Sequence, residues 1–206
     1  MDLVVPIKRL DRAKSRLRGA VAAPHADVVL ALLVDTVTAA ASAAGVRRVL
    51  VVCEDTRVPP ALRGTGVECV DERGLPGLNA ALSFGARVLR ERDRRGVVGA
   101  LQADLPALRP ADLAAAIALA GGRRAFCADR PGTGTTLLLS AAGGSLEPRF
   151  GPGSAAAHAA SGALAIGAEL DSLRCDVDTA RDLGIAAALG LGARTRALAG
   201  RKPTFT

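Results

Sequence analysis

The sequence has very few aromatic residues. Its 206 residues include no Trp and no Tyr, and aromatic side chains make up only 2% of the total. Proteins that bind single-stranded nucleic acid stack the bases on aromatic side chains, so this chain has little from which to build such a surface. Half of the residues are apolar, which excludes a disordered chain.

Cysteine and histidine are also scarce. The four cysteines lie far apart, and no two have the spacing of a zinc site or a redox motif. We interpret Cys53, Cys69, Cys127 and Cys175 as reduced core thiols. Charged residues begin at Asp2, which argues against a signal peptide, and no apolar run reaches membrane-spanning length. These features predict a cytoplasmic protein that has no membrane partner.

The charge balance is strongly basic, with a formal net charge of +7 and a pI of about 10.2. Such an excess favours anionic partners, and nucleotides or phosphorylated metabolites qualify as well as DNA. The densest stretch is "IKRLDRAKSRLRG" (7–19), which holds six Lys and Arg residues directly after an apolar run. It could be a nucleic-acid-binding face, a solvated helix, or a device that holds phosphates at the end of a strand.

Short apolar, β-branched runs alternate with stretches of helical periodicity. This pattern predicts an α/β fold with a mostly parallel sheet flanked by helices. The chain length favours one domain over 1–190, followed by a basic, solvated tail over 191–206. The expected strands cover 3–7, 47–53, 67–70, 97–102, 124–128 and 135–140, and the expected helices cover 24–44, 78–92, 110–120 and about 152–161.

Three carboxylates are expected at the carboxyl ends of the strands, where open parallel sheets collect their ligands. Asp104 ends the fourth run in "QADLP", where it would hold a metal or cap the next turn. In "RCDVDTARDL", Asp176 and Asp178 alternate and so share one face if the segment is extended. Two such carboxylates repel each other unless a cation lies between them, and Mg²⁺ suits them. Asp178 could also cap a helix that contains Asp182.

Three loops rich in Gly could bind anions or bases. The turn in "DRPGTGTTLLL" and the loop before the helix in "RFGPGSAAAHAASG" offer main-chain N–H groups, with Ser154 as a cap or a ligand hydroxyl. We interpret His158 as a surface or packed histidine. In "GLPGLNAAL", Asn79 would cap a helix or read a nucleobase edge. Each of these signals is weak when taken alone.

The cations of the 7–19 stretch follow the first strand and therefore lie at the same edge of the sheet. Their spacing does not place all six on one face of a helix, so some of them must be solvated. We expect Lys8, Lys14 and Arg16 to meet an anionic ligand. The residues left to solvent are Arg9, Arg12 and Arg18.

Six motifs in this order, "PIKRLDRAKSRL", "GLNAAL", "LQADLPAL", "ADRPGTGTTLL", "RFGPGS" and "LRCDVDTARDL", resemble the phospholactate/phosphoenolpyruvate guanylyltransferase family. These are the CofC and FbiD proteins of deazaflavin coenzyme biosynthesis, and the sequence is most similar to the actinobacterial FbiD branch. The resemblance runs from about residue 3 to residue 185. It implies a single Rossmann-like nucleotidyltransferase domain.

The resemblance also implies an activity. The family transfers GMP from GTP to a three-carbon phosphorylated acid and releases diphosphate. With phosphoenolpyruvate, the product would be enolpyruvoyl-2-diphospho-5'-guanosine, an intermediate of coenzyme F(420) biosynthesis that a downstream transferase of the same pathway would use. The motifs do not distinguish phosphoenolpyruvate from 2-phospholactate or 3-phosphoglycerate.

Roles for individual residues follow from the same resemblance. Mg²⁺ would be held by Asp104, Asp176 and Asp178, and the acceptor would contact Thr135, Gly151 and Ser154. The nucleotide would lie near Lys8, Lys14, Arg16 and Asn79, with Lys14 and Asp104 as the catalytic pair. Many members have Asn after the second Thr of the "GTGT" turn, where this chain has Thr136.

The chemistry is consistent with the lack of a Ser-His-Asp set. A phosphate monoester is already ionised at neutral pH, so it needs alignment and charge neutralisation more than a strong base. The alternatives are a cytidylyl- or molybdopterin guanylyl-type nucleotidyltransferase, a glycosyltransferase that uses "DVD", and a basic nucleic-acid-binding module. Related sugar and molybdenum-cofactor enzymes have a Gly-rich loop after the first strand, whereas this chain has no glycine before Gly19. That difference favours the guanylyltransferase branch.

Overall fold

The structure, a computed structural model, describes residues 1–11, 13–72 and 74–200. In this part of the chain, a seven-stranded sheet has the order β3-β2-β1-β4-β6-β5-β7. Strand β6 is antiparallel to both of its neighbours, and the other pairs are parallel. The strands are β1 (Asp2–Ile7), β2 (Arg48–Cys53), β3 (Glu68–Asp71), β4 (Val98–Leu101), β5 (Ala125–Ala128), β6 (Thr135–Leu139) and β7 (Leu164–Ala165).

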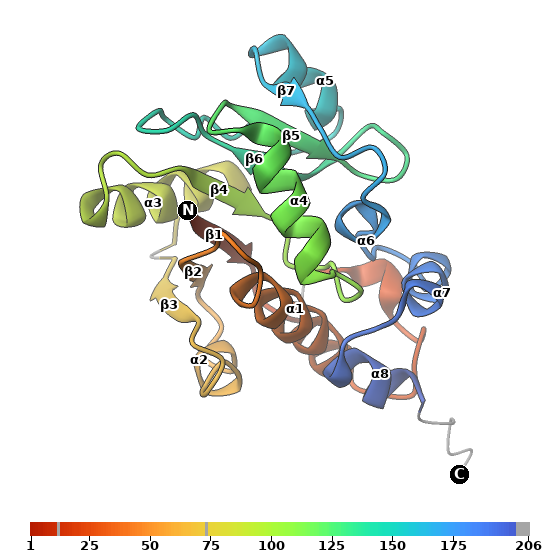
Figure 1. Cartoon of the computed structure of the whole chain (residues 1–206). Helices are drawn as coiled ribbons and strands as arrows, with labels where there is room; N and C mark the ends of the chain where they lie inside the picture. Colours follow the sequence, from red (N-terminus) through yellow and green to blue (C-terminus); the bar gives the residue numbers. More distant parts are fainter. Residues whose placement is uncertain (12, 73, 201–206) are drawn as a thin grey trace.

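Helices cover both faces of this sheet (Figure 1). Helices α1 and α4 pack on one face, and α3 and α5 pack on the other, because alternate residues of each strand point to opposite sides. Leu3 and Val5, for example, join the cluster on the α1 side, and Val4 joins the cluster on the α3 side. The helices are η1 (Ser15–Leu17), α1 (His25–Ala41), α2 (Val58–Ala61), α3 (Leu78–Arg92), α4 (Pro110–Ala120), α5 (Ser154–Ala160), α6 (Asp171–Arg174), α7 (Ala180–Leu189) and α8 (Ala193–Ala199).

One glycine sets how closely α3 approaches the sheet. A Cβ atom on Gly85 would lie 2.6 Å from Val4 Cγ1 and 2.8 Å from Val52 Cγ2, which is closer than carbon atoms pack. Any larger side chain here would push α3 away from β1 and β2. Since α3 begins at the edge of the sheet that carries the candidate site, this contact helps to fix that edge.

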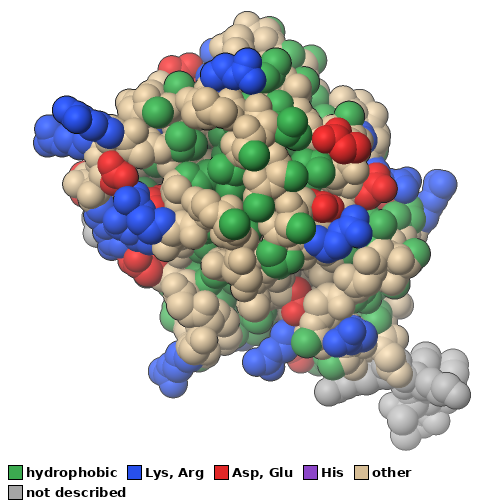
Figure 2. Space-filling view, in the orientation of Figure 1, with side chains coloured by type: hydrophobic (Ala, Val, Ile, Leu, Met, Phe, Trp, Pro, Cys, Tyr) green, Lys and Arg blue, Asp and Glu red, His purple; other side chains and the backbone are tan. Residues whose placement is uncertain are grey.

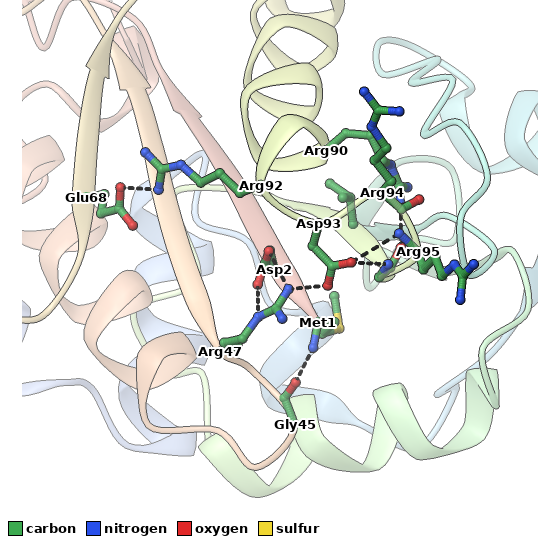
Figure 3. A network of polar contacts seen from close by, with 12 residues as sticks. Met1, Asp2, Gly45, Arg47, Glu68, Arg90, Arg92, Asp93, Arg94 and Arg95 are labelled. Carbon is green, nitrogen blue, oxygen red and sulfur yellow. Dashed lines mark hydrogen bonds and ion pairs between the residues drawn. The ribbon is translucent and has the colours of Figure 1, made fainter.

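An ion network ties down the opposite edge, where the parallel strands begin. Arg47 donates two hydrogen bonds of 2.9 Å to the carboxylate of Asp2, which is only 2% exposed, and a third of 2.6 Å to Asp93 (Figure 3). The N-terminal ammonium of Met1 donates to the carbonyl oxygen of Gly45. Ligands of such sheets bind at the opposite edge, at the carboxyl ends of the strands. We therefore assign this network to stability and not to ligand binding.

The six expected strands and the four expected helices are confirmed, and α3 and α4 have the predicted bounds. The structure adds β7, α2 and α6, which are too short for periodicity to reveal. It also corrects the start of α7. The N-cap is Thr179, whose side chain forms a reciprocal capping box with Asp182, and the N-cap is therefore not Asp178.

Part of the segment expected to be a solvated tail packs on the domain. Helix α8 lies against α1, and the carboxylate of Asp35 accepts hydrogen bonds from the main-chain N–H groups of Arg194 and Thr195. Thr195 is 2% exposed. The last six positions, 201–206, lie outside the described residues. Among the described residues, no helix is both long enough and apolar enough to cross a membrane.

The four cysteines are free thiols, as expected, but their environments differ. Cys127 and Cys175 are separately buried, whereas Cys53 on β2 and Cys69 on β3 lie with their sulfur atoms 3.1 Å apart. Cys69 is partly exposed and so is not a core thiol. The two cysteines are 16 positions apart in sequence, and the parallel pairing of β2 with β3 brings them together.

Candidate active site

The candidate site lies where the chain changes direction across the sheet. Strands β1 and β4 are parallel neighbours in the sheet. The chain continues from β1 to β2 on one side of this pair and from β4 to β5 on the other side, which makes a topological switch point between β1 and β4. The carboxyl ends of β1 and β4 lead directly into Lys8 and Gln102. A cavity of about 340 Å³ opens here, lined by apolar side chains together with Lys8, Lys14, Gln102 and Asp104.

Asp104 is held in place through its main chain. It is 6% exposed, and the N–H group of the next residue, Leu105, donates to the hydroxyl of Thr36 on α1 at 2.9 Å. That hydroxyl donates in turn to the carbonyl oxygen of Leu32. On the other side, the N–H group of Val177 donates to the carbonyl oxygen of Asp104 at 3.0 Å. The segment that carries Asp176 and Asp178 therefore lies directly beside Asp104.

Lys14 connects the carboxylates. Its ammonium group contacts both Asp104 Oδ2 and Asp178 Oδ1, and its side chain is 21% exposed. Burial alone would lower its pKa, but the attraction of Asp104 and Asp178 outweighs burial and raises the pKa above the ordinary value. Lys14 also has a φ of 53°, in the left-handed region that side chains seldom adopt. Such conformations gather at functional sites.

Asp176 has a different environment from Asp178. Burial and, next, the repulsion of Asp104 raise the pKa of Asp176 to about 7, although Lys14 partly opposes the shift. Asp178 is instead about half exposed and paired with Lys14. Val177 between them is buried, as expected for an extended segment with both carboxylates on the opposite side.

The carboxylates do not form a ready metal site as they stand. Among the described residues, no three His, Cys, Asp or Glu side chains are grouped closely enough to hold an ion. The reason is visible in the contacts, since Lys14 lies between Asp104 and Asp178. Two features nevertheless fit a divalent cation. Asp104 Oδ1 is buried without a hydrogen-bond partner in the described part of the chain, and Asp176 lies in a field of like charge.

The expected acceptor residues Thr135 and Ser154 lie at the same edge of the sheet, although they do not line this cavity. Because β6 runs antiparallel to β4, Thr135 at its start lies at the same edge, and Gln102 N–H donates to the carbonyl oxygen of Thr136. Ala155 at the start of α5 donates to Thr133, which brings Ser154 to this edge as well. Thr135 and Ser154 are 4% and 2% exposed, so their side chains mainly pack.

His158 is a packed histidine, as expected. Its ring is fully buried beside Phe150, and its Nε2 accepts a hydrogen bond from the main-chain N–H of Arg149. A main-chain N–H only donates, so the proton of the neutral ring lies on Nδ1 and is donated to Thr135 Oγ1 at 2.9 Å. Burial, and then the positive charges of Arg124 and Arg149, lower the pKa of His158 to about 4.

Asn79 does not cap α3, and its side chain binds the loop before α5. The N-cap of α3 is Gly77, so Asn79 does not cap the helix. Its side-chain amide donates to the carbonyl oxygen of Phe150 at 2.9 Å, and its side-chain oxygen accepts from the N–H of Phe150 at 2.8 Å. Both ends of the side chain are therefore engaged by the loop before α5. Asn79 and His158 together hold two consecutive residues of that loop.

The "GTGT" segment is a turn whose donors are already used. The main-chain N–H groups of Thr133 and Gly134, which could have bound an anion, donate to the carboxylate of Asp129 at 2.9 and 2.8 Å. The turn is therefore closed by the chain's own carboxylate. Gly151, in the loop that Asn79 and His158 hold, is exposed.

The cations of the basic stretch lie in different places. Lys8 is exposed and lines the cavity with Lys14, whereas Arg16 is exposed on η1. Arg9 pairs with Asp11 at the surface, and Arg18 donates to the carbonyl oxygen of Asp11. Arg12 lies outside the described residues. Figure 1 shows the stretch after β1 passing close to α6 and α7, which agrees with the contact between Lys14 and Asp178.

Two features were not foreseen from the sequence. The role of Thr36 depends on a contact between residues 69 positions apart, and a threonine in an apolar helix gives no signal of it. A larger cavity of about 790 Å³ lies between α3 and the 143–148 segment, lined by Arg87, Arg90 and Arg94. It holds none of the three carboxylates, and Arg90 is engaged by carbonyl oxygens and by Ser140.

Solved structures with the same architecture identify the fold. The structure is similar to that of 4-diphosphocytidyl-2C-methyl-D-erythritol synthase, with a TM-score of 0.63 and 16% sequence identity. The similarity covers 91% of this chain and 98% of the other. A nucleotidyl transferase from Methanothermobacter thermautotroptrophicus gives a TM-score of 0.55 and 18% identity over 91% of this chain and 96% of the other. The fold is that of the nucleotidyltransferases.

Sequence comparison places the chain within one family of this fold. Residues 1–199 match the family described as "Guanylyl transferase CofC like", and the chain belongs to that family. A phosphoenolpyruvate guanylyltransferase from Salinispora arenicola is 51% identical over 96% of this chain and 92% of its own length. A protein of the same name from Thermomonospora curvata is 48% identical over 100% of this chain and 91% of its own length.

Proposed function

We propose that this protein transfers GMP from GTP to phosphoenolpyruvate and releases diphosphate. The observation that carries the proposal is the meeting of Lys14, Asp104 and Asp178 at the switch point, in a chain of the guanylyl transferase family. Relatives that are 51% and 48% identical over nearly their whole length bear the name phosphoenolpyruvate guanylyltransferase. The product would be enolpyruvoyl-2-diphospho-5'-guanosine, for use by a downstream transferase in coenzyme F(420) biosynthesis.

In this reaction a phosphate oxygen of the acceptor attacks the α-phosphorus of GTP. The bond between the α-phosphorus and its bridging oxygen breaks, and diphosphate leaves with the electron pair. The attacking oxygen carries no proton to remove at neutral pH, so the site needs no general base. Its task is to bring two anions together. Lys8 and Lys14 at the cavity wall supply positive charge for the triphosphate, and the exposed Arg16 would add to it.

Asp104, Asp176 and Asp178 are the residues that would hold Mg²⁺. When bound there, the ion would offset the charge of the triphosphate and of the leaving diphosphate. The buried, unpartnered Asp104 Oδ1 and the repulsion between Asp104 and Asp176 support this assignment. Thr36 and Val177 contribute by fixing the main chain around Asp104.

The acceptor would bind at the loop that begins α5. Gly151 has exposed backbone there, and Thr135 and Ser154 lie beside it with small, largely buried side chains. Asn79 and His158 would act indirectly, since both hold this loop through its main chain. We therefore assign Asn79 to positioning the acceptor loop, rather than to reading the nucleobase.

A panel of nucleotides and acceptors tests the proposal. Diphosphate release should require GTP, a divalent cation and phosphoenolpyruvate together, and 2-phospholactate and 3-phosphoglycerate should be measured in parallel. Release from CTP or ATP but not from GTP would favour a cytidylyl or another nucleotidyltransferase.

The basic nucleic-acid-binding alternative has little support on the face drawn in Figure 2, where Lys and Arg side chains are scattered among acidic ones. Salt-sensitive DNA binding would revive that alternative.

A further inference from the structure

Lys14 is placed where a cation between the carboxylates would lie. Its ammonium group contacts Asp104 and Asp178 at once, although the two aspartates are 74 positions apart in sequence and come from different segments. A compact ammonium and a divalent metal ion both seek carboxylate oxygens. Both cannot occupy one position between the same two groups.

The backbone of Lys14 is also in a strained conformation. Its φ of 53° is one of only two positive φ values among the described non-glycine residues. Pairing with two carboxylates offsets the strain of that conformation. Among the described residues between Lys8 and Arg18, the short helix η1 is the only regular element, and the hydrogen bonds between their main-chain groups are local ones such as that from Leu17 N–H to the carbonyl oxygen of Lys14.

The carboxylates still have unused binding capacity. Asp104 Oδ2 meets Lys14, but Asp104 Oδ1 is buried and has no partner among the described residues. Asp178 is about half exposed, so its second oxygen can be reached from the solvent side. One ammonium therefore satisfies this group of carboxylates only in part.

We propose that Lys14 is an exchangeable internal counter-ion, which occupies the carboxylates in the free protein and moves to the triphosphate when GTP and a divalent cation bind. The inference rests on the proposed function for its nucleotide, but the part that concerns metal affinity does not depend on turnover. Without nucleotide, a metal ion must displace Lys14 from Asp104 and Asp178, so it binds weakly. A triphosphate offers the displaced ammonium new anionic oxygens and therefore favours the exchange.

The test is metal affinity measured without acceptor and without turnover. Binding of Mn²⁺ alone is followed by electron paramagnetic resonance, and Mg²⁺ alone by calorimetry, for the wild type and for Lys14→Met. We expect Lys14→Met to bind the ion about tenfold more tightly or better, because no lysine has to be displaced. GTP affinity measured with a chelator present should fall in the same variant.

Lys8→Met is the matched control, because it removes the same charge from the same loop and cavity wall but from a residue that contacts neither carboxylate. It should change Mn²⁺ affinity much less than Lys14→Met. Lys14→Arg keeps the charge and should keep the weak metal binding. If Lys14→Met does not fold, as judged by circular dichroism, Lys14→Gln serves in its place.

Equal metal affinity in the wild type and Lys14→Met would overturn the inference, as would the same increase in Lys14→Met and Lys8→Met, which would show only a general effect of charge. These outcomes would leave the proposed function standing if GTP and phosphoenolpyruvate still react. Conversely, a selective gain in metal affinity in Lys14→Met, together with no guanylyl transfer by the wild type, would support the exchange and contradict the proposed function.

Discussion

The main-chain N–H of Val177 donates a hydrogen bond to the carbonyl oxygen of Asp104 at 3.0 Å. This one contact joins the end of β4 to the segment before α7, more than seventy residues later in the chain. Because it runs through the main chain, it aligns the two segments and leaves the side chains of Asp104, Asp176 and Asp178 free for other contacts. This main-chain hydrogen bond therefore fixes the positions from which the three carboxylates extend.

Replacing either carboxylate of the pair by its amide should separate activity from folding. We expect Asp176→Asn and Asp178→Asn each to lower metal-dependent diphosphate release by about a hundredfold or more. Asp176→Asn should leave the melting temperature unchanged or raise it, because it removes a partly buried charge that Asp104 repels. Near-normal turnover in either variant would show that the pair is only structural.

The Thr36 hydroxyl should matter for both stability and catalysis. Thr36→Val keeps the shape but removes the acceptor of the Leu105 N–H, which should lower the free energy of unfolding by about 1–2 kcal/mol. We expect kcat to fall because the Asp104 loop loses its support. Thr36→Ser should restore most of both losses. Thr38→Val, at an exposed position of the same helix, is the control and should change neither quantity.

His158 should make stability depend on pH. Its folded pKa of about 4 lies below the ordinary value of 6.5, so the unfolded chain binds more protons between these values. The contribution is fully present above about pH 6.5 and is lost as the pH falls toward 4, by roughly 3 kcal/mol at most. Chemical denaturation at several pH values checks this. The slope in that window should be smaller in His158→Gln, and an unchanged slope would assign it to other groups.

Arg47 should stabilise the edge of the sheet away from the site. Arg47→Ala leaves the buried Asp2 carboxylate without its two hydrogen bonds, which should lower the free energy of unfolding measurably. Arg92→Ala removes an exposed pair with Glu68 and should lower it much less. Neither variant should alter the Michaelis constants for GTP or the acceptor. Equal losses of stability in the two variants would contradict the special role of Asp2.

The fold was predictable because each long element has a strong local signal. The strands that are buried on both faces appear as continuous apolar runs, and α4 has Pro110 in its first turn and Gly121 after its last residue. The carboxylates could be predicted for a related reason. Each follows a recognisable strand or extended segment, and the topology brings those ends to one edge.

The contacts made by side chains could not be predicted in the same way. Nothing in "GLNAAL" distinguishes an Asn79 that reads a base from one that binds the main chain of Phe150, 71 positions later. Likewise, the turn around Gly134 looked open to an anion until the structure showed the Asp129 carboxylate bound to it. These outcomes depend on which distant groups compete for a donor, and local sequence does not record that competition.

The central claim is that the site joins GMP to phosphoenolpyruvate, and the most direct measurement is the mass of the product. The protein is incubated with GTP, Mg²⁺ and phosphoenolpyruvate labelled with ¹³C, and the mixture is analysed by mass spectrometry against an Asp178→Asn control. The account predicts a labelled species with the mass of GMP joined to phosphoenolpyruvate through a diphosphate link, and none with the control. Diphosphate release that yields GMP alone, or a labelled adduct only with another nucleotide, would contradict it.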